Sequence, residues 1–159
     1  MNKTFTDGVY RFTVGADDGV RLLVDGVNVV PAGAFANQPY TTYTSEPLCL
    51  SAGVHSFEIH YFESGAHARL TFNYEEVLEL DTNSPQQVCI NAATPTLTVS
   101  SPDTDVTAFN WYKNGTLVFT GASYTPSAAE LDMGLATSTT FQVTALYACG
   151  ETQPVAVDV

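Results

Sequence analysis

The sequence predicts an all-β protein of two domains, and three observations carry this prediction. Apolar and polar residues alternate over residues 8–14 and again over 19–24, as they do in half-buried strands. Short runs of the same kind resume at residue 96 and are separated by turn residues. Signals for helices are almost absent, apart from residues 127–131, where a serine precedes an early acid in what we expect to be a short turn.

The first two predicted strands meet at the tandem aspartate of Asp17-Asp18-Gly19. Their apolar faces are Tyr10, Phe12 and Val14 on the first strand, and Val20, Leu22 and Val24 on the second. On spacing alone the joint is a turn, because Asp-Gly between alternating strands is typical of a type I′ hairpin. The alternative is a metal site, in which both carboxylates converge on a hard cation such as calcium.

Convergence of two neighbouring carboxylates is not compatible with ordinary strand geometry. Successive side chains of a strand point to opposite faces, so Asp17 and Asp18 would diverge. A metal site therefore requires a departure of the backbone from that geometry, for example a non-proline cis peptide bond. The residues alone leave both the turn and the metal site open.

Residues 7–74 resemble the protective-antigen domain, a β-sandwich found in anthrax protective antigen, yeast flocculins, bacterial adhesins and many glycosidases. The resemblance is carried by residues 8–14, 17–22, 24–26 and 50–63. It implies that Asp17 and Asp18 flank a cis peptide bond and hold calcium, and that sugar hydroxyls bind the ion directly. It therefore implies a calcium-dependent lectin or adhesin module whose partner is a carbohydrate.

The resemblance also implies a second loop at the site, over residues 63–68. Glu63 would be the third carboxylate ligand, at a position where sugar-binding members often carry asparagine. Backbone carbonyls would complete the coordination, and they belong to Ser64, Gly65 and Ala66. His67 is either a solvated loop residue or a contact to the bound sugar. Because family members have a substantial segment before the strand that begins at Gly8, we expect the sandwich to be shortened at its N-terminus.

Composition favours an exported protein that does not bind nucleic acid and does not insert into a membrane. Seventeen acidic and five basic residues give a net charge of −12, which repels phosphate backbones and favours cations. No stretch approaches the ~20 apolar residues that span a bilayer. Residues 1–7 lack the features of a signal peptide, so we expect any export signal to lie outside this sequence.

A polar, aperiodic segment around residues 81–87 divides the chain into predicted domains 1–83 and 84–159. In the second domain, a single Trp111 lies between two cysteines among short strands, an order typical of an immunoglobulin-like sandwich. The segment also resembles immunoglobulin-like repeats of Bacteroidetes-type surface proteins. This resemblance implies a spacer in a secreted or cell-surface protein.

In the immunoglobulin-like arrangement, Cys89 and Cys149 fall on strands that are expected to face each other. We therefore predict a disulfide between them, with Cys49 left as a buried thiol in the apolar strand over residues 47–50.

Nothing in the sequence indicates a catalytic centre, so we expect no enzyme activity from this chain. It contains neither a phosphate-binding glycine loop nor a serine nucleophile elbow. The aromatic residues Phe35 and Tyr40, in an irregular segment, are either core filler or a platform for a sugar. The main alternative function is structural: a rigid spacer or protein-contact module in which Asp17-Asp18-Gly19 is only a turn.

Overall fold

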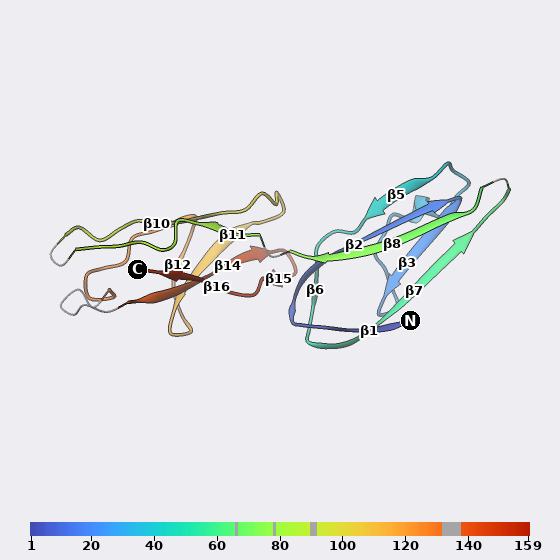
Figure 1. The fold of residues 1–159 in the computed structure, drawn as a ribbon. Helices are drawn as coiled ribbons and strands as arrows, with labels where there is room; N and C mark the ends of the chain where they lie inside the picture. Colours follow the sequence, from blue (N-terminus) through green and yellow to red (C-terminus); the bar gives the residue numbers. More distant parts are fainter. Residues whose placement is uncertain (66, 78, 90–91, 132–137) are drawn as a thin grey trace. The chain divides into compact units, whose positions relative to one another are not determined.

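The computed structural model describes residues 1–65, 67–77, 79–89, 92–131 and 138–159, and it is all-β, as predicted (Figure 1). The chain divides into two compact units, Met1–Val77 and Leu78–Val159. Among the described residues, no helix is long and apolar enough to cross a membrane.

The first unit contains two four-stranded sheets, whose strands, apart from β4, are labelled in Figure 1. One sheet has the order β1-β7-β3-β4, with bounds Asn2–Phe5, Gly53–Phe62, Gly19–Val24 and Val27–Asn28. In the other, β2 (Gly8–Asp17) pairs with β5 (Thr41–Thr44), β6 (Leu48–Leu50) and β8 (Arg69–Glu76). A short 3₁₀ helix, η1 (Ala32–Ala34), lies between β4 and β5.

The core of this unit confirms the predicted alternation of β2 and β3. All six residues of the two predicted apolar faces are buried, with at most 3% of their surface exposed. Aromatic rings surround Phe12, including Phe5 and Phe57 with ring centroids 6.1 and 5.3 Å away. A side-chain period of two places these residues on one face of each strand, where they pack together.

The hairpin interpretation of Asp17-Asp18-Gly19 is wrong. β2 and β3 belong to different sheets, and no ladder pairs them among the described strands. The chain therefore passes from one sheet to the other at Asp18. The type I′ turn also requires positive φ at its central residues, and neither Asp18 nor Gly19 has one.

The second unit is built around one larger sheet, in which β11 and β14 are the central pair. Its strands are β12 (Thr116–Thr120), β11 (Ala108–Lys113), β14 (Thr140–Tyr147), β15 (Gly150–Glu151) and β16 (Val155–Asp158). A smaller sheet contains β13 (Ser123–Tyr124), β10 (Leu97–Ser100) and β9 (Asp81–Thr82). Trp111 is fully buried in the core, and its indole N–H donates to the carbonyl of Gly121 at 2.9 Å. The immunoglobulin-like assignment stays a prediction.

The predicted disulfide is wrong. Cys49 and Cys149 are the disulfide-bonded cysteines, and Cys89 is a free, exposed thiol. Cys89 lies in an irregular segment rather than on a strand, so it has no facing strand position from which to pair. Cys49 is exposed because it alternates with Leu50, whose side chain is buried on the other face of β6.

A capped turn at residues 127–131 confirms the expected serine cap, because Ser127 Oγ accepts the backbone N–H of Glu130 at 3.3 Å. The backbone N–H and hydroxyl of Ser127 both donate to Glu130 Oε2 at 2.7 Å, and the Tyr124 hydroxyl donates to Oε1. These hydrogen bonds, with that of Tyr124 the largest cause, lower the pKa of Glu130 to about 2. The Glu130 carboxylate thereby ties the turn to the core residue Tyr124.

We expect thiol labelling to distinguish Cys89 from the other two cysteines. Because only Cys89 is free, the protein unfolded without reductant should take up one label, and peptide mapping should place it on Cys89. After reduction, all three cysteines should react. A label on Cys49 or Cys149 without reductant would contradict the structure.

We expect Glu130→Gln to destabilise the protein at neutral pH. A folded-state pKa below the unfolded value stabilises the protein above the unfolded value of 4.5 and loses that contribution as the pH falls toward 2. Hydrogen bonds to a charged group suggest a loss on the order of 1–2 kcal/mol in the free energy of unfolding at pH 7. The difference between parent and variant, measured by urea unfolding, should shrink toward pH 2. Glu79→Gln, at an exposed carboxylate, is the control and should show no such difference.

Candidate functional site

Three carboxylates converge where β2, β3 and β7 end or begin. Asp17 is the last residue of β2, Asp18 immediately precedes β3, and Glu63 immediately follows β7. The peptide bond between Asp17 and Asp18 is cis, the geometry that the resemblance implied. One oxygen from each carboxylate lies within 4.8 Å of the other two. We call these three residues the carboxylate cluster; no other such group of His, Cys, Asp or Glu was found among the described residues.

Asp18 is the most firmly held member of the carboxylate cluster. It is 7% exposed, and both of its carboxylate oxygens accept hydrogen bonds. Ser64 donates its backbone N–H and its hydroxyl to Oδ2, each at 2.7 Å, and the backbone N–H of Gln38 donates to Oδ1 at 3.1 Å. The Ser64 N–H is the largest cause that lowers the pKa of Asp18, so the group stays ionised in mildly acidic solution.

Tyr61 links the other two members of the carboxylate cluster. Its hydroxyl lies 2.7 Å from the backbone carbonyl oxygen of Asp17 and 3.2 Å from Glu63 Oε2, and it donates its single proton between these two acceptors. Burial, and then the neighbouring Glu63 carboxylate, raise the pKa of Tyr61. The hydroxyl therefore remains a donor at neutral pH and holds Glu63 beside the Asp17 backbone.

Gln38 anchors the loop between η1 and β5 to the site. Besides its backbone contact with Asp18, its side-chain amide donates to the carbonyl of Asp18 at 3.1 Å and to that of Ala34 at 3.2 Å. The amide oxygen accepts the hydroxyl proton of Tyr43, on β5, at 2.5 Å. Every polar group of the Gln38 side chain is thus used to fix this loop against Asp18.

The chemistry of the carboxylate cluster is that of a site for a hard cation. Three carboxylates at this separation repel one another, and a divalent cation between them would relieve that repulsion. Oxygen ligands with flexible geometry are the preference of calcium. Asp17 is half-buried and Glu63 is exposed, so an ion held here would remain accessible from solvent.

The structure places some of the residues predicted for the second loop at the carboxylate cluster, but not all of them. Ser64 lies at the cluster as a hydrogen-bond donor to Asp18, and the N–H of Gly65 donates to Glu63 Oε1 at 2.7 Å. His67 is exposed and does not belong to the carboxylate cluster. Ala66, predicted as a backbone ligand, lies outside the described residues. The role of these backbone carbonyls as ligands stays a prediction.

Aromatic residues pack against two glycines, one before and one after the tandem aspartate in sequence. A Cβ on Gly15 would clash with the hydroxyl of Tyr40, and one on Gly19 would clash with the ring of Phe62. The Phe62 ring packs edge-on against Phe35 at 4.9 Å between centroids. Phe35 and Tyr40 therefore lie near the site rather than in the core, with 38% of Phe35 exposed.

An arginine lies against each of two aromatic rings near the site, those of Tyr40 and Phe35. The guanidinium carbon of Arg69 lies 3.8 Å from the Tyr40 ring centroid, and that of Arg21 lies 5.0 Å from the Phe35 ring centroid. Both arginine residues are exposed. The register pairs Arg69 of β8 directly with Asp17 of β2, a member of the carboxylate cluster.

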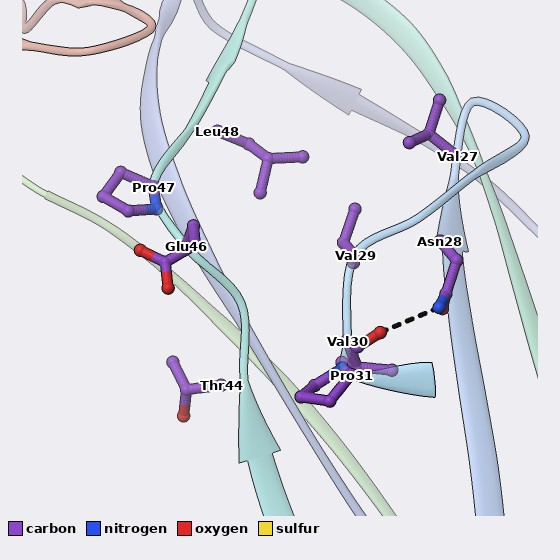
Figure 2. A pocket seen from close by; sticks show the side chains of 9 residues that line it. All are labelled: Val27, Asn28, Val29, Val30, Pro31, Thr44, Glu46, Pro47 and Leu48. Carbon is purple, nitrogen blue, oxygen red and sulfur yellow. Dashed lines mark hydrogen bonds between the residues drawn. The ribbon is translucent and has the colours of Figure 1, made fainter. Parts of the chain in front are cut away.

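A separate hollow of about 460 Å³ lies between the segment after β3 and the connection from β5 to β6 (Figure 2). Val29 and Pro31 line one side, and Pro47 and Leu48 line the other. Among the described residues that line it, Glu46 alone carries a carboxylate. The hollow therefore lacks the set of anionic oxygens that distinguishes the carboxylate cluster.

Sequence reasoning missed three residues that position the cluster: Gln38, Tyr61 and the hydroxyl of Ser64. Tyr61 carried a usable signal, because residues two apart on a strand share a face and Tyr61 precedes Glu63 by two. Gln38 carried none, since it lies 20 residues after Asp18 in an irregular loop.

The comparisons with known proteins agree with this geometry. Residues 4–96, more than half of the chain, match the model of the PA14 domain, the protective-antigen-type domain. The comparison with curated proteins found no match. Two sheets joined at the tandem aspartate and the match over residues 4–96 lead to one conclusion: the chain belongs to the PA14 domain family.

Proposed function

We propose that this chain is a calcium-dependent carbohydrate-binding module in which the ion is held by the carboxylate cluster. PA14 domains are associated with carbohydrate binding and adhesion. The observation that carries the proposal is the approach of Asp17, Asp18 and Glu63 oxygens to within 4.8 Å of one another. Calcium is the cation whose ligand preferences these oxygens fit.

The site has a rigid side, at Asp18, and an open side, at Glu63. Asp18 is buried and hydrogen-bonded on both oxygens, which keeps its carboxylate in place before any ion arrives. Glu63 is exposed, so the ion would keep coordination positions facing solvent. Calcium takes six to eight oxygen ligands, so three carboxylates leave positions that two neighbouring sugar hydroxyls fill.

The rest of the chain supports a non-catalytic module of an exported protein. PA14 domains are typical of extracellular proteins. Disulfide-bonded Cys49 and Cys149 fit an oxidising compartment. In this proposal, the second unit acts as an immunoglobulin-like spacer that presents the first at a cell surface or in a secreted protein.

Calcium should stabilise the parent protein but not Asp17→Asn. We expect a dissociation constant of roughly 10⁻⁴ to 10⁻³ M, as in extracellular calcium modules. At about 100 times that concentration, binding adds about 2.7 kcal/mol to the free energy of unfolding, so thermal melting should shift upward by several degrees. Asp17→Asn removes one ligand charge and should abolish the shift. Glu46→Gln, a matched change in the separate hollow, should keep it; no calcium-induced shift in the parent would refute the metal site.

Sugar binding should depend on the same ion. A glycan array probed in the presence of calcium should show ligands that share a vicinal diol, and a chelator should remove every signal, because the ion bridges carboxylates and hydroxyls. Glu63→Gln should weaken these signals without lowering the melting temperature of the calcium-free protein, since Glu63 is exposed. Signals that survive the chelator would indicate a different site. A complete absence of signals would favour a structural spacer.

A further inference from the structure

We propose that the sugar held at the carboxylate cluster is acidic, and that Arg69 binds its carboxylate while calcium binds its hydroxyls. The inference rests on the proposed function and adds the class of ligand to it. It follows from the placement of Arg69, from its lack of an acidic partner, and from the donors that its guanidinium still offers.

Arg69 is placed beside the cluster by the register of β2 and β8. Asp17 and Arg69 are directly paired, and directly paired residues of antiparallel strands carry their side chains on the same face of the sheet. The guanidinium lies 3.8 Å from the ring centroid of Tyr40, whose hydroxyl is bonded to Thr71 Oγ1 at 2.7 Å. Gly15 leaves the space that this hydroxyl occupies. Arg69 is therefore held on a fixed ring at the edge of the site.

Arg69 does not neutralise the cluster next to it. Within the part of the chain that the structure describes, no carboxylate forms an ion pair with its guanidinium. The chain has 17 acidic and only five basic residues, so composition alone would favour an acidic partner for each arginine. The charge of Arg69 is thus available to an incoming anion.

The stacking on Tyr40 leaves the useful donors of Arg69 accessible. A cation–π contact uses the face of the guanidinium, whereas its N–H groups lie in the plane and form a fork that fits a carboxylate. Arg69 is also exposed. A uronic acid carries vicinal hydroxyls and a carboxylate on one ring, so a single residue of an acidic glycan can engage the ion and Arg69 together.

Because the protein has a large negative net charge, an anionic ligand needs the positive charges of both calcium and Arg69. A chain of charge −12 repels an acidic sugar at a distance. The bound calcium offsets part of the charge of the three carboxylates, and Arg69 supplies a local positive charge where the sugar carboxylate lies. A neutral sugar gains only from the ion and should bind more weakly.

The test compares matched pairs of sugars in saturating calcium. The probes are the methyl glycosides of glucuronic, galacturonic and mannuronic acid, each paired with its neutral hexose, and binding is followed by NMR titration of the parent protein. We expect at least one uronide to bind roughly five- to tenfold more tightly than its neutral partner. Arg69→Gln should remove most of this preference, and the neutral sugar should still bind because the titration is made in saturating calcium.

Two further variants keep the result interpretable. Arg21→Gln removes the same charge from the other arginine on an aromatic ring and should retain the preference. Arg69→Lys keeps the charge but loses the planar fork and should retain only part of it. The attraction of calcium itself for a carboxylate is the same in all variants, so it cannot produce a difference between them.

The outcomes separate this inference from the proposed function. Calcium-dependent binding with equal affinity for acidic and neutral sugars would overturn the role of Arg69, and so would an equal loss of both in Arg69→Gln. Absence of any calcium-dependent sugar binding would overturn the proposed function, and this inference with it. Melting curves of each variant exclude unfolding as the cause of a loss.

Discussion

The first unit depends on the set of hydrogen bonds that the Asp18 carboxylate accepts. These bonds come from two loops that are distant in sequence, through Gln38 on one side and Ser64 on the other. A nearly buried carboxylate is tolerated because its oxygens are matched by donors. The same bonds bring Glu63 next to the tandem aspartate, because Ser64 follows it directly. Asp18 therefore contributes both to the link between the two sheets and to the candidate ion site.

Local patterns were sufficient to predict β2 and β3 and the position of the tandem aspartate between them. The alternation around Phe12 and Leu22 reports burial directly, because a strand has a side-chain period of two. The serine cap at Ser127 was equally local, since its partner Glu130 lies three residues further on. Features of this kind depend on a few neighbouring residues and need no knowledge of the fold.

Long-range pairings were beyond the same reasoning. The spacing of Asp18 and Gly19 favoured a hairpin, yet tertiary structure sends the two flanking strands into different sheets. The cysteine pairing failed because it assumed that Cys89 lies on a strand, whereas the segment is irregular. The contribution of Gln38 depends on a loop packing against a residue 20 positions earlier, which no periodicity encodes.

The hydrogen bonds to Asp18 also determine how freely the surrounding loops can change in evolution or design. Two of the three donors to its carboxylate are backbone N–H groups, at positions 38 and 64. Any amino acid except proline supplies a backbone N–H, so the loops can diverge in side chains while the carboxylate keeps these partners. A library randomised in the exposed residues between η1 and β5 would thus vary ligand specificity while the backbone hydrogen bonds to Asp18 stay the same.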